Sequence, residues 1–373
     1  MGRGAADADV LVVGAGPVGL AAAVHACAAG LDVLVVDHRA GTLDKACGEG
    51  LLPGALRAVQ ALGADPPGHV LTGISYRAPG RHADHEFTAG PGRGVRRTAL
   101  HDALRARAAD VGARRRCGRV TALRQDAAGV EIEVTPGRAD DGHPAGDAAD
   151  GDPVTLRAPW LLGCDGLHSA VRRLAGLDVR PGPGAGRPAG NRYGLRRHFA
   201  VTPWTDLVEV HWSPHAEAYV TPVAPDLVGV ALLAPRTVTG AGFDTLLRSQ
   251  FPELAARLAV AEPTGTLLGA GPLLRRSRRR SAGRVRLVGD ASGYVDALTG
   301  EGVRVGLAQA AAAVRHLEDA EAYERAWRTV TRDYRVLTTG LVAWASGPAR
   351  GAIVPAAARL PWLYGAVVDR LAR

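Results

Sequence analysis

The sequence predicts an α/β protein of the Rossmann type, with an inserted antiparallel β-sheet and a C-terminal helical segment. Three observations support this fold class. A strand, a glycine turn, a helix and a second strand follow one another between Val10 and Asp37. Four strand-like segments separated by turns lie between residues 193 and 233, and helical periodicity resumes after Gly302. Alternating strands and helices favour a parallel sheet, whereas the run of strands favours an antiparallel insert.

The first forty residues are the most regular part of the chain. Val10–Val13 is a continuous apolar run typical of a buried strand. Leu20–Ala29 is rich in alanine and predicts a helix that ends at Gly30, and Val33–Val36 predicts the next strand. These elements form a strand–helix–strand unit.

The middle of the chain predicts further elements. Helical periodicity is present in two segments, and a hairpin is expected on either side of a connection rich in Asp, Gly and Ala, which is the best candidate for a disordered loop. The helices are expected at Leu51–Leu62 and Thr98–Ala109, the hairpin strands at Glu131–Thr135 and Val154–Leu156, and the connection at Pro136–Pro153. After a Gly/Pro-rich spacer at Asp178–Gly190, the four strands of the insert are expected at Tyr193–Val201, Leu207–Trp212, Ala216–Val223 and Leu227–Leu233.

The last hundred residues predict a return to the first domain and then a helical segment. Arg284–Val288 predicts a short strand, and Val303–His316 and Ala320–Leu337 predict helices. Beyond Thr338 apolar stretches alternate with Arg and Pro, as in amphipathic packing segments.

Composition excludes several classes of function. The 373 residues are 47% hydrophobic, which suffices for a large core. The net charge is +8, but Lys45 is the only lysine, and no helix-turn-helix, zinc-finger or aromatic-basic signature is present, so we expect no nucleic-acid partner. The four cysteines, Cys27, Cys47, Cys117 and Cys164, are neither closely spaced nor accompanied by a histidine cluster, so we expect no metal site.

Hydropathy predicts a cytoplasmic protein. The first ten residues lack the apolar region of a signal peptide, and no run of eighteen residues is apolar without interruption. We therefore expect no integral membrane span, although the apolar C-terminal segments are compatible with peripheral membrane contact. The sequence leaves a monomer and a dimer equally open.

Three motifs indicate a bound dinucleotide. Gly14-Ala15-Gly16-Pro17-Val18-Gly19 lies between a strand and a helix, where glycines permit a tight turn and close approach of a pyrophosphate to the helix N-terminus. Asp37 ends the second strand, where a carboxylate can bind ribose hydroxyls. Later in the chain come Gly163-Cys164-Asp165-Gly166 and Val288-Gly289-Asp290-Ala291-Ser292-Gly293.

The order of these motifs resembles the flavoprotein superfamily of the aromatic-hydroxylase fold, which is p-hydroxybenzoate hydroxylase-like, and within it the branch close to the geranylgeranyl reductases. The resemblance implies bound FAD and NADPH or NADH as electron donor. It also implies an alternation of FAD-binding parts (1–70, 97–177 and 276–316) with substrate-side parts (71–96 and 178–275), followed by C-terminal helices (317–373).

The resemblance and the motifs together assign a set of candidate cofactor residues. Asp290 would contact the ribityl chain, Arg97 the diphosphate, and the helix that begins at Gly300-Glu301-Gly302-Val303 would stabilise negative charge on the reduced flavin. The full set is Gly14, Ala15, Gly16, Pro17, Val18, Gly19, Asp37, His38, Arg39, Lys45, Ala46, Cys47, Gly48, Arg97, Val120, Asp165, Gly166, Gly289, Asp290, Gly300, Glu301, Gly302 and Val303.

The segment Asp44-Lys45-Ala46-Cys47-Gly48-Glu49-Gly50 resembles the Cys-Gly motif of the reductase branch. Two interpretations of Cys47 stay open: a catalytic proton donor, or a small residue packed against the flavin ring. Lys45 would reach a phosphate or ribose, or lie at the surface.

Aromatic residues of the predicted insert, Trp212 and Tyr219 among them, are candidates for contact with substrate. The leading hypothesis from the sequence is an FAD-dependent monooxygenase of secondary metabolism that uses O2 and a lipophilic aromatic or polyketide-type small molecule. The alternative is a reductase or dehydrogenase of an isoprenoid or polyketide C=C bond, which the Leu-Thr-Gly-Glu-Gly run at 298–302 favours. A flavin or lipid carrier without turnover is a third hypothesis, and a halogenase is not expected, because the chain lacks its Gly-Trp-x-Trp-x-Ile-Pro segment.

Overall fold

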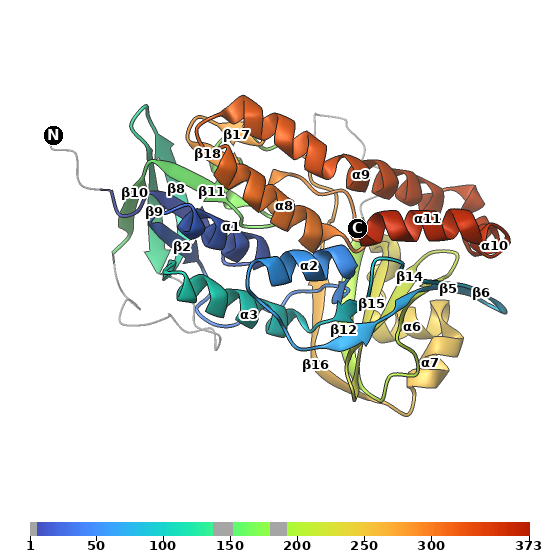
Figure 1. Ribbon diagram of the computed structural model, residues 1–373. Helices are drawn as coiled ribbons and strands as arrows, with labels where there is room; N and C mark the ends of the chain where they lie inside the picture. Colours follow the sequence, from blue (N-terminus) through green and yellow to red (C-terminus); the bar gives the residue numbers. More distant parts are fainter. Residues whose placement is uncertain (1–5, 137–151, 180–191) are drawn as a thin grey trace.

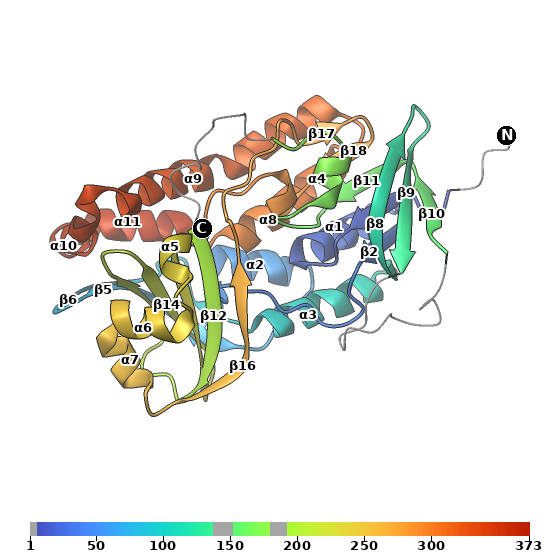
Figure 2. The same cartoon turned by 180° about the vertical axis from the view of Figure 1, so that it is seen from behind.

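The computed structural model describes residues 6–136, 152–179 and 192–373. Two regions lie along the length of the molecule (Figure 1): a layered α/β region at the N-terminal end and a second region built on another sheet. The long helix α9 Ala320–Ser346 runs beside both regions, and this arrangement is also seen from behind (Figure 2). The predicted fold class is confirmed.

The α/β region is built on an eight-stranded sheet of order β10-β9-β8-β2-β1-β11-β18-β17. Strands β8, β2, β1, β11 and β18 pair in parallel, whereas β8, β9 and β10 are antiparallel. The bounds are β1 Val10–Val13, β2 Val33–Asp37, β8 Arg114–Gln125, β9 Val130–Pro136, β10 Val154–Ala158, β11 Trp160–Gly163, β17 Ser281–Ala282 and β18 Val285–Leu287.

Alternation along β1 divides the core of this region into two layers. Val10 and Val12 pack with the helical layer, whereas Leu11 and Val13 pack with β9 and β10 on the other face. The helical layer consists of α1 Pro17–Ala28, α2 Pro53–Ala61, α3 Arg97–Asp110 and α8 Gly302–Arg315. A strand buried on both faces needs an uninterrupted apolar sequence, which explains why β1 could be predicted.

The second region is a seven-stranded sheet of order β16-β12-β15-β14-β13-β5-β6. The four predicted insert strands are adjacent and antiparallel, and β13 also pairs in parallel with β5. Helices α6 Phe243–Gln250 and α7 Pro252–Leu258 cover one face. The strands are β5 Gly73–Ala78, β6 Arg81–Glu86, β12 Arg192–Ala200, β13 Leu207–Trp212, β14 Glu217–Ala224, β15 Leu227–Pro235 and β16 Glu262–Ala270.

The remaining elements before α9 are small. A three-stranded sheet has the order β3-β7-β4, with β3 Gly50–Leu51, β4 His69–Leu71 and β7 Gly92–Gly94. Short helices are α4 Ala170–Leu174 and α5 Arg236–Thr239, and η1 Gly289–Ser292 is a 3-10 turn.

The C-terminal segment is helical, as predicted. It consists of α9 Ala320–Ser346, the 3-10 turn η2 Pro348–Ala352, α10 Ile353–Arg359 and α11 Pro361–Ala372. Tyr364, Val368 and Leu371 of α11 pack with Leu71 and Val208 of the sheets. The end of the chain therefore closes over the second region.

The structure differs from the predicted elements in several places. Helix α1 begins at Pro17, three residues before the predicted start, because proline is well tolerated in the first turn of a helix. Helix α9 extends to Ser346 rather than Leu337. Strands β8 and β16 and helices α6 and α7 were not predicted. Most of the predicted loop at 136–153 and of the spacer at 178–190 lies outside the described residues, and the division of the chain into domains stays a proposal.

Candidate functional site

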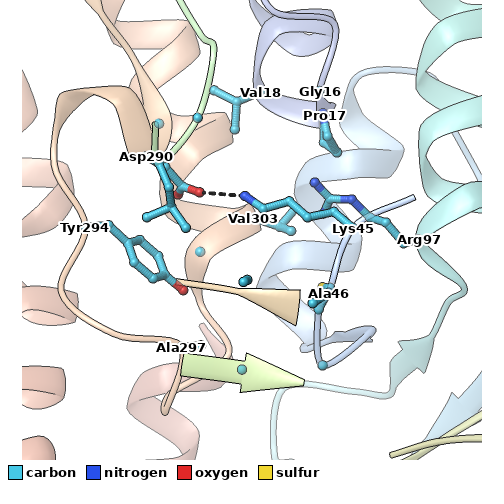
Figure 3. Close-up of a pocket in the computed structure, with 18 of the residues that line it drawn as sticks. Gly16, Pro17, Val18, Lys45, Ala46, Arg97, Asp290, Tyr294, Ala297 and Val303 are labelled. Carbon is cyan, nitrogen blue, oxygen red and sulfur yellow. Dashed lines mark hydrogen bonds and ion pairs between the residues drawn. The ribbon is translucent and has the colours of Figure 1, made fainter. Parts of the chain in front are cut away.

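A cavity of about 720 Å³ lies between the two regions and is lined by segments far apart in the sequence. Most of the predicted cofactor residues line it: Gly14, Gly16, Pro17, Val18, Asp37, His38, Arg39, Lys45, Ala46, Cys47, Gly48, Arg97, Val120, Asp165, Gly166, Gly289, Asp290, Gly300, Gly302 and Val303. Figure 3 shows part of this lining. Ala15, Gly19 and Glu301 are not among the lining residues.

The glycine turn after β1 shows why these positions need glycine. Gly14 has φ +104°, and a Cβ there would lie 2.5 Å from the carbonyl oxygen of Cys164. A Cβ on Gly19 would lie 1.8 Å from the Gly14 carbonyl oxygen, so Gly19 packs the helix against the turn instead of facing the cavity. A Cβ on Gly16 would meet no atom within 4 Å. Gly16 therefore leaves open space in front of the helix.

Two helix N-termini face the cavity. Gly16 precedes α1 and Glu301 precedes α8, and neither helix has a side-chain cap. Their first N–H groups and dipoles favour a negatively charged ligand. Glu301 itself is buried and pairs with Arg304, and burial raises the pKa of its carboxyl group. Glu301 therefore does not face the cavity, and its ion pair with Arg304 stabilises the first turn of α8.

Asp37 is in place at the end of β2 but is already hydrogen-bonded. Its Oδ2 accepts from the backbone N–H of Ala15 at 2.6 Å, and its Oδ1 accepts from that of Arg39 at 3.0 Å. A carboxylate oxygen can accept more than one hydrogen bond, so contact with a ribose remains compatible with these bonds.

Lys45 and Asp290 meet although they are 245 positions apart. Their Nζ and Oδ2 atoms lie 3.3 Å apart, and Figure 3 shows Lys45 reaching across the cavity toward Asp290. Both side chains are partly exposed to the cavity. The ion pair therefore joins the Cys-Gly loop to the Gly-Asp motif.

Arg97 carries a polar group that is available to a ligand. Its side chain lines the cavity, and its Nε is buried without a hydrogen-bond partner among the described residues. Because a buried unpaired guanidinium N–H is costly, an anionic ligand here would be stabilising. This observation supports the predicted diphosphate contact.

The Asp165-Gly166 turn is held by its own hydrogen bonds. Asp165 accepts from the Ser169 hydroxyl and, at 3.0 Å, from the backbone N–H of Val171. Burial raises the pKa of Asp165, and it also raises the pKa of the neighbouring Cys164 thiol. Asp165 lines the cavity but has a clear structural role in fixing this turn.

A buried charged network forms the opposite side of the cavity, and the sequence did not predict it. Glu49 accepts from the Arg97 backbone N–H at 2.8 Å and lies 2.7 Å from His198 Nε2. Arg196 contacts His198 Nδ1 at 3.0 Å and also pairs with Asp44. Arg196 and His198 lie two residues apart on one face of β12. The network fixes the loop Asp44–Gly50 against the seven-stranded sheet.

Glu49 adopts an unusual backbone conformation. Its φ of +58° is the sole positive value among described residues other than glycine. Such a conformation disfavours residues with a Cβ, so surrounding contacts must stabilise it. Those contacts also include a hydrogen bond from Thr221 Oγ1 to the Gly48 carbonyl oxygen at 2.8 Å.

Cys47 lies in this loop and lines the cavity. It is half-buried, and its Sγ accepts weakly from the Glu49 backbone N–H at 3.4 Å. Tyr294, which directly follows the Gly-Asp motif, also lines the cavity, as Figure 3 shows. Burial raises the pKa of Tyr294 well above its usual value, so its hydroxyl stays protonated. The sequence motif ended one residue before Tyr294 and did not indicate it.

The two substrate candidates have different positions. Tyr219 lines the cavity and donates its hydroxyl hydrogen to the Leu298 carbonyl oxygen at 2.9 Å. Trp212 does not line the cavity: it is buried against the Tyr76 ring, with centroids 5.4 Å apart, and beside Arg350. Trp212 packs with residues of the C-terminal helices, so the structure does not place it beside the cavity as predicted, and its contact with substrate stays a prediction.

No cluster of three or more His, Cys, Asp or Glu side chains that could hold a metal occurs within residues 6–136, 152–179 and 192–373. The polar groups that line the cavity include backbone N–H groups, the cations Arg97 and Lys45, and the carboxylates of Asp37 and Asp290. This combination fits a dinucleotide, since it offers cations and helix N-termini for phosphates and carboxylates for hydroxyls.

Three relatives are informative about the chain. A menaquinone reductase of Mycolicibacterium smegmatis is 31% identical over 88% of this chain and 81% of its own length. A digeranylgeranylglycerophospholipid reductase of Methanothermobacter thermautotrophicus is 28% identical over 81% of this chain and 74% of its own length. A 3-(3-hydroxy-phenyl)propionate/3-hydroxycinnamic acid hydroxylase of Mycobacterium avium is 35% identical, over 46% of this chain and 31% of its own length.

Solved structures show the same fold. A flavin-dependent brominase matches with a TM-score of 0.80 and 17% identity, covering 98% of this chain and 94% of its own. A flavoprotein/dehydrogenase from Cytophaga hutchinsonii matches with a TM-score of 0.78 and 18% identity, covering 98% and 92%. The family model described as the FAD binding domain matches residues 7–227, more than half of the chain. The chain therefore belongs to this family of FAD-dependent oxidoreductases.

Proposed function

We propose that this oxidoreductase is a reductase that saturates a carbon–carbon double bond in a lipophilic small molecule of the isoprenoid or quinone type. The observation that carries the proposal is the position of Cys47. Its thiol lies in the wall of the cavity, on a loop that the buried Glu49–His198 contact fixes in place. A proton donor at this position is what reduction of a double bond requires and oxygenation does not.

The side of the cavity away from the glycine motifs supports a lipophilic substrate. Aliphatic side chains from the seven-stranded sheet, from α11 and from two loops line it, namely Leu52, Ile74, Val208, Val210, Leu232, Leu233, Leu268, Leu298, Val368 and Leu371. A surface of this kind gains free energy by covering apolar groups and offers few partners to a charged molecule.

The chain's own residues would have distinct roles in the reaction. When bound, FAD would supply a hydride that originates from NADPH or NADH. The Cys47 thiol would donate a proton to the second carbon of the double bond, and its thiolate would regain a proton from solvent after the product leaves. The α8 N-terminus would stabilise negative charge on the reduced cofactor, and the apolar wall would exclude water from the double bond.

The extent of the relatives' similarity supports reduction over oxygenation. The two reductases match over 88% and 81% of this chain, whereas the hydroxylase matches over 46%. This proposal therefore reverses the preference for a monooxygenase that the sequence motifs alone suggested.

Oxygenation is the second candidate function. It would insert one atom of O2 into a lipophilic aromatic or polyketide-type molecule, and the 35% identity to the hydroxylase favours it. Tyr219 and Tyr294 would then form the aromatic part of the substrate site. In this second proposal the protein would be a cytoplasmic enzyme of secondary metabolism.

A single anaerobic experiment separates the two candidates. Oxygen is removed, the FAD-loaded protein is reduced with NADPH, and a polyprenyl lipid without a quinone ring is added while flavin absorbance is followed, because a quinone ring would itself accept two electrons and gain two mass units. Reduction of a double bond predicts flavin reoxidation without O2 and a product two mass units heavier. Reoxidation only in the presence of O2, with ¹⁸O in the product, would support oxygenation and reject the reductase.

Variants then test the proton donor. Cys47→Ala should reduce turnover by about 10²–10⁴-fold while hydride transfer from NADPH to FAD continues, because general acid catalysis contributes a factor of this order. Cys27→Ser, a half-buried cysteine on α1 outside the cavity, is the matched control. Full turnover by Cys47→Ala would remove Cys47 from the mechanism and leave it as a packing residue.

A further inference from the structure

The C-terminal segment has an unusual charge pattern. From Tyr334 to Val368 the sequence contains no Asp or Glu, and its charged residues are Arg335, Arg350 and Arg359. The structure folds this stretch into the end of α9, η2, α10 and most of α11, which lie together at the end of the molecule opposite the N-terminus (Figures 1 and 2). This stretch therefore contributes apolar side chains and positive charge alone, and the exposed carboxylates nearby, Asp84 and Glu86, belong to the neighbouring strand β6.

The bend between α10 and α11 exposes large apolar side chains. Leu360 is 41% exposed, Trp362 71% and Leu363 44%, and exposed Arg359 precedes them. We call these four residues the elbow. Trp344, near the end of α9, is also 37% exposed. Exposed tryptophan next to arginine is typical of side chains at a membrane–water interface.

The geometry of the elbow suits a surface contact. No single helix in the described part of the chain is long and apolar enough to cross a membrane, but Pro348–Arg359 and Pro361–Ala372 meet this test as a pair bent by 100°. The bend places the elbow at a corner, where it can enter an interface while both helices stay on the protein.

Helix α11 connects the elbow with the cavity. Near its beginning, Tyr364 donates to the Ile74 carbonyl oxygen at 3.0 Å, and near its end Val368 and Leu371 line the cavity. The helical rise from Trp362 to Leu371 is about 14 Å. One short helix thus has an apolar exposed start and an apolar end that borders the cavity.

We propose that the elbow docks on a lipid membrane that carries anionic headgroups. Leu360, Trp362 and Leu363 enter the interface, and Arg359 pairs with lipid phosphates. The absence of acidic residues in this stretch of sequence argues for an anionic membrane as the partner, because no carboxylate there would repel it. The inference concerns binding and does not depend on the reaction proposed above.

Vesicle co-flotation of the FAD-loaded protein tests this inference. We expect binding to phosphatidylcholine vesicles containing about one third phosphatidylglycerol, and weaker binding to phosphatidylcholine alone. The double variant Trp362→Ser/Leu363→Ser should bind roughly tenfold more weakly, because it removes two inserting side chains. Arg359→Gln should weaken binding about fivefold, only to the vesicles with phosphatidylglycerol.

Val260→Ser is the matched control, since Val260 is 90% exposed after α7, in a different part of the chain. It should bind like the unmodified protein. Thermal midpoints and FAD content should be equal in all variants, because each changes an exposed side chain. No vesicle binding, or equal binding by the double variant, would overturn the proposal. A dimer in size-exclusion chromatography that the double variant dissociates, without a change in vesicle binding, would instead assign the elbow to contact between two copies.

Discussion

The two walls of the cavity are built in different ways. The wall with the sequence motifs uses glycines and two helix N-termini, so it presents mainly backbone N–H groups to a ligand. The opposite wall, beside β12, depends on buried ionisable side chains: Glu49, Arg196 and His198. Backbone groups recognise any dinucleotide phosphate, whereas a side-chain network can fix one particular loop. We therefore expect the first wall to bind the cofactor and the second to hold the loop Asp44–Gly50 in place.

The largest effect is expected when the side-chain wall is broken. Glu49→Ala removes the carboxylate beside buried His198 and one of the two carboxylates near buried Arg196, and we expect a loss of about 3–5 kcal/mol of unfolding free energy. Glu86→Ala, an exposed glutamate on β6, should change stability by less than about 0.5 kcal/mol. Urea unfolding of both variants measures the difference. A loss below about 1 kcal/mol for Glu49→Ala would show that the network does not hold this wall.

Substitutions in the wall with the glycine motifs should change FAD affinity more than they change the free energy of unfolding. Gly14→Ala strains a residue at φ +104° and places its Cβ against Cys164, which we expect to cost on the order of 2–3 kcal/mol and to weaken FAD binding at least about tenfold. Gly30→Ala also strains a positive φ, +82°, but meets no atom within 4 Å. It should cost about 1 kcal/mol and leave FAD affinity unchanged. Fluorescence titration with FAD and thermal unfolding compare the two, and equal FAD affinity would contradict the assigned role of the turn.

The same contrast decides how much could be predicted from the sequence. The β1–α1–β2 unit was predicted closely because β1 is apolar throughout and glycines mark the turn. Strand β8 was missed because it begins with three consecutive arginines, which resemble a surface loop, although they pair with β2. Helices α6 and α7 are short and lie next to each other, so neither gives a sustained helical period.

In the site, the sequence motifs predicted the wall with the glycines and helix N-termini. They did not predict the opposite wall with Glu49, Arg196 and His198. Arg196 and His198 alternate along β12, and charged residues in such a pattern normally indicate the solvent-facing side of a strand. Only the tertiary structure shows that this face lies against Glu49. A conformation such as the positive φ of Glu49 likewise has no sequence signal when the residue is not glycine.

Arg97 tests whether the unpaired guanidinium belongs to the cofactor site. Arg97→Gln removes the buried Nε–H group that has no partner among the described residues, and we expect FAD to bind about tenfold more weakly, since a hydrogen bond to a charged group contributes about 1.5–3 kcal/mol. Arg96→Gln, at the exposed preceding position, is the control and should bind FAD normally. Unchanged affinity in Arg97→Gln would place the diphosphate elsewhere.

The smallest effect on stability is expected for Lys45, whose side chain connects the two walls. Its ion pair with Asp290 is partly exposed, so Lys45→Met should cost the protein without FAD no more than about 1 kcal/mol. The effect on FAD affinity is the more informative measurement, because it separates the two interpretations of this lysine. If Lys45 reaches the cofactor, FAD affinity falls severalfold and the fall diminishes at high salt, as expected for a screened charge contact. If Lys45 only neutralises Asp290, FAD affinity changes little, since the freed carboxylate can still accept hydrogen bonds from hydroxyl groups. Titration of the unmodified protein and of Lys45→Met with FAD, at low and at high ionic strength, therefore decides whether Lys45 binds the cofactor or only pairs with Asp290.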